Sequence, residues 1–139
     1  MPDRVLIIDD DPILRHMVRS ILELAEYEAF EAVDGPDGLA QAARRDPDII
    51  LLDLMMPGMD GYETCRGLKA DPTTTDIPVI FVTASADPTL NRRAYAAGAV
   101  ACIPKPFRRE ALLATIDLAR KQALRRPGHG APPRGEARR

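Results

Sequence analysis

Short apolar runs alternate with amphipathic helical stretches along this chain, and this alternation constrains the fold more than any other feature of the sequence. Five runs have the length and composition of strands: residues 4–8, 28–32, 48–52, 78–82 and 100–103. The third and fourth runs are apolar without alternation, which is typical of central strands covered on both faces, whereas the second and fifth are weaker and fit the edges of a sheet. Strands that alternate with helices predict a parallel sheet built from βα units.

The stretches between these runs have the periodicity of helices. The first helix is predicted to start at Pro12, with Asp11 as its N-cap. Its predicted apolar stripe consists of Ile13, Leu14, Met17, Val18, Ile21, Leu22 and Ala25, with Arg15, Arg19, Glu23 and Glu26 lying off it. Further helices are predicted at residues 36–45, 61–70, 88–97 and 107 to about 124, with Gly98 ending the fourth. Together these elements predict one α/β domain, a (βα)5 sandwich with right-handed crossovers.

The formal net charge of -2 conceals a split between the body of the chain and its end. The last 20 residues hold seven basic side chains and one acid, a net charge of +6, and the preceding 119 residues carry -8. Residues 123–139 are rich in Pro, Gly, Ala and Arg, so we expect a disordered basic tail after a folded domain at residues 1–122. Whether this tail is a natural terminus or a linker to a further domain stays open.

Charge, hydropathy and cysteine content also limit the possible surroundings and partners. The acidic body argues against nucleic-acid binding through the folded domain, and no apolar stretch reaches the roughly 18 residues that would span a bilayer. Cys65 and Cys102 are too few for a disulfide framework and have no metal-ligand spacing. We therefore expect a cytoplasmic protein with reduced thiols and no membrane partner.

Polar side chains follow four of the five predicted strands. They are Asp9, Asp10 and Asp11 after the first strand, Asp53 after the third, Thr83 after the fourth and Lys105 after the fifth. Ligands of open parallel sheets bind at the carboxyl ends of the strands, so these groups are expected to converge. Helix capping accounts for Asp11, and for Asp60 before the third helix, but it leaves Asp9, Asp10 and Asp53 unexplained.

Electrostatics indicates what such a cluster of acids binds. Two carboxylates about 4 Å apart repel each other by roughly 4 kcal/mol at an effective dielectric constant near 20, so a cation must neutralise them. Oxygen ligands and a site shared with phosphate favour Mg2+. The Lys105 ammonium and the Thr83 hydroxyl can both donate to phosphoryl oxygens. This combination of groups is suited to phosphoryl transfer.

Over about residues 3–122 the chain resembles the receiver domains of bacterial two-component response regulators. The resemblance is carried by five separated elements in order: Asp9-Asp10, Asp53 with residues 56–61 (MPGMDG), Thr83-Ala84, Gly98-Ala99 and Lys105-Pro106-Phe107. It implies a flavodoxin-like, doubly wound sheet with strand order 2-1-3-4-5 and a cis peptide bond between Lys105 and Pro106. It also implies that Asp53 is the phosphoacceptor and that Mg2+ is held by Asp9, Asp10, Asp53 and the backbone carbonyl of Met55. Thr83 would bind the phosphoryl group and Lys105 would pair with it.

The resemblance also implies how the protein would work. Asp53 would take a phosphoryl group from a sensor histidine kinase or a phosphotransfer protein, and the phosphoprotein would signal to a downstream effector through its fourth helix, fifth strand and fifth helix. The implied protein is a monomer or a phosphorylation-dependent homodimer. It is not an enzyme in the usual sense, because it catalyses only its own phosphorylation and slow dephosphorylation.

Three positions near this site change what we expect of the conformational response and of the lifetime of the phosphorylated state. Cys102 stands where the family usually has Tyr or Phe on the fifth strand, so we expect a shallower conformational change on that face. Met55 lies two residues after Asp53, and Ser85 lies two residues after Thr83. In this family, these two positions tune the lifetime of the acyl phosphate. An apolar Met cannot orient a hydrolytic water, which favours slow loss of the phosphoryl group.

Three other classes of protein remain for comparison. A metal-dependent phosphohydrolase with an aspartyl-phosphate intermediate would carry a second Asp where Met55 stands, which counts strongly against it. A flavodoxin-like electron carrier is excluded because no Ser/Thr/Gly-rich loop follows the first strand. An interaction module that has lost phosphorylation is the least favoured alternative, because all five functional positions are intact.

Overall fold

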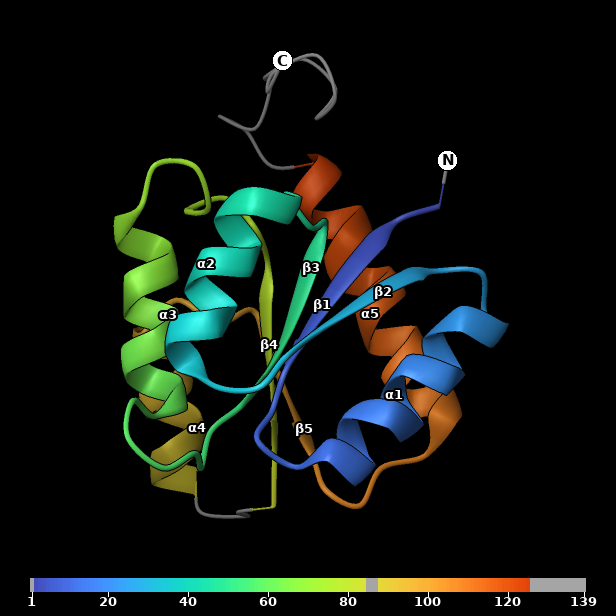
Figure 1. Cartoon of the computed structure of the whole chain (residues 1–139), viewed down its shortest axis with the longest axis horizontal. Coiled ribbons are helices and arrows are strands. Elements are labelled where there is room, and N and C mark those ends of the chain that lie inside the picture. Colours follow the sequence, from blue (N-terminus) through green and yellow to red (C-terminus); the bar gives the residue numbers. More distant parts are fainter. Residues whose placement is uncertain (1, 85–87, 126–139) are drawn as a thin grey trace.

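A single parallel sheet lies at the centre of the molecule, with helices on both faces (Figure 1). The computed structural model describes residues 2–84 and 88–125. The strands are β1 (Arg4–Ile8), β2 (Glu28–Ala32), β3 (Ile49–Asp53), β4 (Val79–Thr83) and β5 (Ala101–Pro104). The helices are α1 (Pro12–Leu24), α2 (Gly35–Arg45), α3 (Gly61–Ala70), α4 (Pro88–Ala96) and α5 (Arg109–Arg125). The strand order β2-β1-β3-β4-β5 confirms the doubly wound fold predicted from the sequence.

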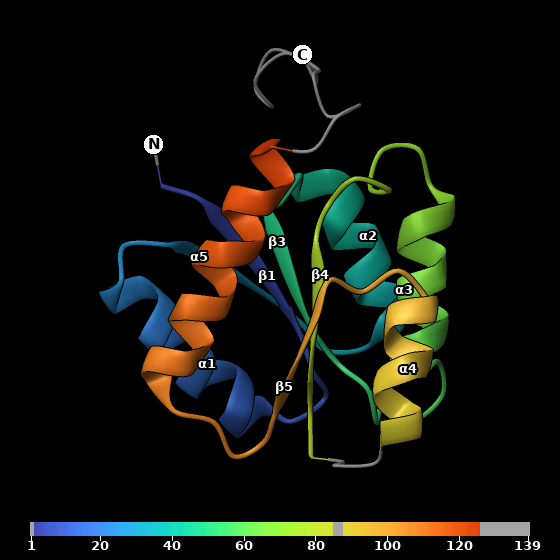
Figure 2. The same ribbon diagram turned by 180° about the vertical axis from the view of Figure 1, so that it is seen from behind.

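The helices divide into two layers, which explains why the central strands are apolar throughout. Helices α1 and α5 cover one face of the sheet, and α2, α3 and α4 cover the other (Figures 1 and 2). In β3, Ile49 and Leu51 join the core on the first face, whereas Ile50 and Leu52 join the core on the second. Successive side chains of a strand point to opposite faces, so a strand covered on both sides needs no polar alternation.

Helix α1 begins as predicted, but its predicted apolar stripe is partly wrong. The Asp11 carboxylate caps the helix by accepting hydrogen bonds from the backbone N–H groups of Ile13 and Leu14. Ile13, however, is 80% exposed and Met17 is 46% exposed, whereas Arg15 is buried. The predicted stripe was wider than the contact face of one helix, and the long Arg15 side chain reaches an acidic partner on β2 that periodicity does not reveal.

Three strands lie one residue later than predicted, which changes how the candidate site is supported. Asp53 and Thr83 are the last residues of β3 and β4, and not the first residues after them. Asp53 pairs with Val82 in the sheet register, and Thr83 pairs with Pro104. Ladder pairing depends on backbone groups, so it continues through polar residues that end an apolar run. Both side chains are therefore carried on strands.

The remaining element boundaries agree with the prediction within two residues. Asp60 caps α3 through a capping box with Glu63. After α4, Gly98 adopts a φ of 111°, a left-handed conformation that favours glycine at the end of a helix. Helix α5 runs to Arg125, so the first residues of the segment assigned to the tail are helical, and residues 126–139 lie outside the described part of the chain. Within the described residues, no helix combines the length and apolarity needed to cross a membrane.

Candidate functional site

Three carboxylates meet where β1 and β3 end, at the lower edge of the sheet in Figure 1. Asp9 directly follows β1, Asp10 lies in the loop to α1, and Asp53 ends β3. Each residue offers one oxygen, and these oxygens all lie within 4.8 Å of one another. Asp9 and Asp53 are buried, whereas Asp10 is exposed at the rim. The structure thus brings together the three acids that capping could not explain.

Lys105 reaches this cluster from the loop after β5. Its Nζ atom lies 3.2 Å from Oδ2 of Asp9 and 3.4 Å from Oδ1 of Asp53. The Lys105 backbone N–H donates to the Thr83 carbonyl at 2.8 Å, and the following peptide bond to Pro106 is cis, as the resemblance implied. One ammonium group therefore contacts both buried carboxylates.

The environment of Asp53 opposes its ionisation. Burial, and secondarily the charge of Asp9, raise the pKa of Asp53 from 3.8 to about 6, although Lys105 and a hydrogen bond from the Met55 N–H favour the charged form. The positive charge of one lysine is therefore too little to compensate for burying two carboxylates side by side. A further cation at this site would stabilise the folded protein.

The raised pKa of Asp53 predicts how stability depends on pH. From about pH 4 to about pH 6 the folded protein keeps a proton that the unfolded chain has lost, so ionisation of Asp53 lowers stability as pH rises through this window. The Asp53→Asn variant lacks this effect. In chelator, its stability advantage over the wild type should grow by roughly 1–3 kcal/mol between about pH 4 and about pH 7. Urea unfolding at several pH values measures this, and an advantage that stays constant would contradict the prediction.

The ligand atoms of the cluster fit Mg2+. Its donors are carboxylate oxygens, which are the ligands that this hard cation prefers, and they lie close enough to share one ion. Asp10 is exposed, so the cluster reaches solvent on one side. The role of the Met55 carbonyl stays a prediction, since the structure shows only that the Met55 N–H donates to Asp53 at 3.4 Å and that its side chain is 67% exposed.

Thr83, Ser85 and Cys102 are the remaining residues that were predicted to lie at or near the site. Thr83 is buried at the end of β4, the strand that neighbours Asp53. Ser85 lies outside the described residues. Cys102 is half-buried on β5 and lies beside Tyr95 of α4, which is half-exposed: burial, and secondarily Cys102, raise the pKa of the Tyr95 hydroxyl. An aromatic side chain is thus present on this face, but it comes from α4 and not from β5.

Two structural supports of the site were not found from the sequence. Gly61, at the start of α3, packs so close that a Cβ atom would lie 2.6 Å from the Asp53 carbonyl oxygen, so only glycine lets α3 begin against the end of β3. Arg15, assigned to the solvent side of its helix, donates to the backbone carbonyl of Asp9. Arg15 also donates to Glu31, and an acid within a predicted strand is a sequence signal for a basic partner nearby.

Fold and site together define a class of protein: a doubly wound α/β domain with an acidic, lysine-capped pocket at the carboxyl edge of its sheet. The family follows from the comparison with known sequences. A family model described as the response regulator receiver domain matches residues 5–117, and the chain belongs to this family. The general role of such domains is to accept a phosphoryl group.

Individual relatives agree with this assignment. The chain is 42% identical over 113 residues to the DNA-binding dual master transcriptional regulator RpaA of Synechocystis, covering 81% of this chain and 47% of the regulator. The chain spans about half or less of the length of the first curated relatives that it matches.

Solved structures show the same fold. Chemotaxis protein CheY4 of Vibrio cholerae superposes with a TM-score of 0.82 at 32% identity, covering 86% of this chain and 99% of that protein. The receiver domain of sensor histidine kinase PA1611 of Pseudomonas aeruginosa superposes with a TM-score of 0.81 at 26% identity, covering 87% and 99%. That structure has a magnesium ion coordinated in its active site cleft.

Proposed function

We propose that Asp53 is the phosphoacceptor of this chain and that its donor is the phosphohistidine of a sensor histidine kinase or a phosphotransfer protein. The observation that carries the proposal is the placement of Asp53, which is buried, in contact with Lys105, and close to two further carboxylates at an open edge of the sheet. Burying two carboxylates side by side beside a single lysine is costly, so a cluster of this kind indicates a ligand that they bind.

The groups at the site would divide the work as follows. A carboxylate oxygen of Asp53 attacks phosphorus; the new O–P bond forms as the P–N bond of the donor breaks, and its electron pair stays on the imidazole nitrogen. Asp9, Asp10, Asp53 and the Met55 carbonyl would hold Mg2+, which supplies positive charge next to the phosphoryl oxygens when bound. Lys105 would exchange its contact with Asp53 for one with a phosphoryl oxygen, and the Thr83 hydroxyl would donate to another.

The readout would lie on the face made by α4, β5 and α5. A phosphoryl group on Asp53 adds negative charge and acceptor oxygens beside Thr83, which ends β4 next to β5. Movement of Thr83 would shift the equilibrium of this face, where Tyr95 of α4 lies beside Cys102 of β5. We propose that a downstream effector, or a second copy of the chain, binds there, and that turnover is limited to phosphorylation and slow dephosphorylation of Asp53.

Incubation with acetyl phosphate and Mg2+ tests the phosphoacceptor role. Intact-mass spectrometry should show a gain of one phosphoryl group, and fragments should locate it on Asp53. A parallel sample with excess chelator should take up little label, since the site then lacks the cation that its three acids fit. A wild-type protein that takes no label in Mg2+, or carries it on another residue, would overturn the proposal.

The side chain of Met55 predicts that the phosphoryl group is lost slowly. It is 67% exposed near the open side of the site and has no group that could orient an attacking water. After removal of the donor, the phosphorylated wild type should therefore lose its label more slowly than a Met55→Asn or Met55→Glu variant, which regain a polar group there. Decay followed by intact mass in Mg2+ measures this, and equal or faster decay of the wild type would refute the role given to Met55.

A further inference from the structure

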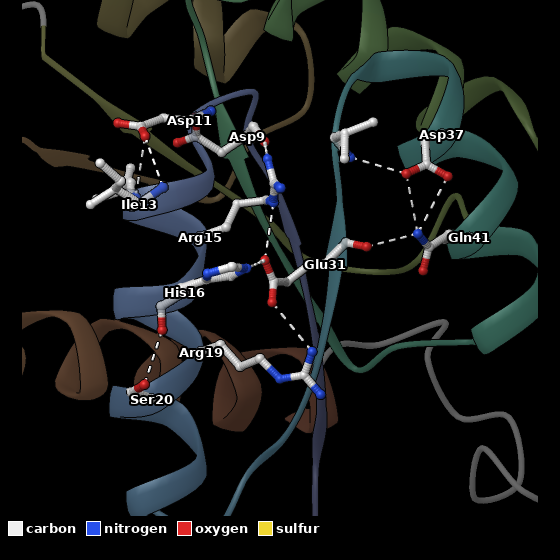
Figure 3. Close-up of polar contacts among 12 residues, drawn as sticks. Asp9, Asp11, Ile13, Arg15, His16, Arg19, Ser20, Glu31, Asp37 and Gln41 are labelled. Atoms are coloured by element: carbon white, nitrogen blue, oxygen red, sulfur yellow. Dashed lines mark hydrogen bonds and ion pairs between the residues drawn. The ribbon is translucent and has the colours of Figure 1, made fainter.

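Arg15 links the acidic cluster to the neighbouring strand β2. Its side chain leaves α1 and runs toward the sheet, where it donates two hydrogen bonds to different elements (Figure 3). Nη1 donates to the backbone carbonyl of Asp9 at 2.8 Å, in a buried hydrogen bond, and Nε donates to Oε1 of Glu31 at 3.0 Å. The Arg15 and Glu31 side chains are only 11% and 14% exposed, so both charges are largely removed from water.

Every polar atom of Asp9 has a partner. Its N–H donates to the Ala32 carbonyl at 3.2 Å, and its carboxylate accepts from the Asp11 N–H at 2.9 Å and from Lys105 at 3.2 Å. The fourth polar atom, the carbonyl oxygen, is the one that Arg15 binds. Asp9 would therefore keep its carboxylate in place through three other hydrogen bonds if Arg15 were absent.

Asp10 is held differently. No described residue hydrogen-bonds to its carboxylate, which is exposed, yet this carboxylate lies within reach of Asp9 and Asp53. Its position therefore depends on the direction in which the backbone leaves Asp9. The Asp9 carbonyl belongs to the planar peptide unit that joins Asp9 to Asp10, so a hydrogen bond to this oxygen restrains the orientation of that unit.

We infer that Arg15 is a positioning residue for the cation site: it holds the Asp9–Asp10 peptide unit and thereby keeps the Asp10 carboxylate aimed at Asp9 and Asp53. The inference rests on the proposed function, because it concerns the cation that phosphorylation requires. Arg15 itself binds the backbone carbonyl of Asp9 and contacts no carboxylate of the cluster. Outer hydrogen bonds that orient metal ligands commonly change metal affinity by 10- to 100-fold when they are removed.

Glu31 anchors Arg15 in this orientation. Its Oε1 atom accepts from Arg15, and its Oε2 atom lies 3.3 Å from Nη1 of Arg19. His16 also faces Glu31, with Nε2 at 3.5 Å from Oε1 (Figure 3). Arg19 contacts the same acid but is 44% exposed and makes no contact with Asp9. It is thus a matched control for Arg15: a cation of the same type, on the same helix and bound to the same partner.

The sign of the effect separates positioning from simple electrostatics. Removing a cation near an acidic site strengthens Mg2+ binding if charge alone matters, because the site becomes more negative. Removing a group that orients Asp10 weakens Mg2+ binding despite this gain. Arg15→Lys keeps the positive charge but lacks the planar guanidinium that reaches both partners at once. It therefore separates the contribution of charge from the contribution of orientation.

Titration calorimetry of Mg2+ into the wild type, Arg15→Met, Arg15→Lys and Arg19→Met tests the inference without any phosphodonor. We expect about 10-fold weaker binding for Arg15→Met. Arg15→Lys should bind Mg2+ with intermediate affinity, and Arg19→Met should stay within about twofold of the wild type. Circular dichroism confirms that each variant is folded at the temperature used. If Arg15→Met does not fold, Arg15→Lys carries the comparison.

Binding of Mg2+ that is unchanged or tighter in both Arg15 variants overturns the inference, as does an equal loss in Arg19→Met. The outcome for the proposed function is separate. If the wild type binds Mg2+ but takes no label from acetyl phosphate, the proposed function is wrong, while the Mg2+ affinities of the variants still decide the role of Arg15. A wild type that binds no Mg2+ overturns the role of Arg15 as well.

Discussion

An Asp53→Asn variant is expected to take up no phosphoryl group from acetyl phosphate in the presence of Mg2+, under conditions that label the wild type. The amide of asparagine has no carboxylate oxygen to attack phosphorus. The carboxylate oxygens of Asp9 already accept hydrogen bonds from the Asp11 N–H and from Lys105, and we expect Asp9 to hold the cation and not to attack phosphorus. Intact-mass spectrometry of both proteins after the same incubation measures the difference.

Asp11→Asn is the matched control for this experiment. It removes the same charge two residues from Asp9, on an exposed side chain whose structural role is to cap α1. Asparagine caps helices about as well as aspartate, so this variant should fold normally and be labelled like the wild type. Equal labelling of Asp53→Asn and the wild type would show that the phosphoacceptor lies elsewhere.

A Lys105→Met variant is expected to be less stable than the wild type in chelator, by about 1–3 kcal/mol, the cost of leaving buried acceptors without their donor. Its Nζ atom contacts Asp9 and Asp53, whose side chains are only 4% and 8% exposed, so removing it leaves two buried like charges without the ammonium that contacts both. Millimolar Mg2+ should restore much of the lost stability, since the cation supplies the missing charge. The gap between unfolding curves with and without Mg2+ should therefore be wider in the variant.

Urea unfolding of both proteins, with chelator and with Mg2+, measures these differences. Lys121→Met provides the control, because Lys121 is 62% exposed and pairs with Asp117 on the surface of α5. A surface pair of this kind contributes at most about 1 kcal/mol, and its loss should not depend on Mg2+. A Lys105→Met protein as stable as the wild type, or one with a narrower gap, would show that Lys105 does not neutralise the acids.

Much of the fold could be predicted because its determinants are local. The apolar runs that became β1 and β2 were placed at their observed bounds, and Asp11 and Asp60 cap the helices predicted for them. The ends of β3 and β4 were placed one residue early, because the ladder extends into the polar residues Asp53 and Thr83 through backbone pairing. Strand β5 also ends one residue later than predicted, at Pro104. The inward position of Arg15 could not be predicted, since helical periodicity assigns a charged residue to the solvent side.

By itself, the sequence determined the order of strands and helices and the convergence of Asp9, Asp10, Asp53 and Lys105 at one edge of the sheet. It could do so because the carboxyl ends of parallel strands share an edge, whatever the details of packing. Only the tertiary structure decided which groups touch. Lys105 contacts Asp9 across 96 positions of sequence, and Arg15 reaches both the Asp9 carbonyl and Glu31. Such contacts depend on how layers pack in three dimensions, and no periodicity along the chain encodes them.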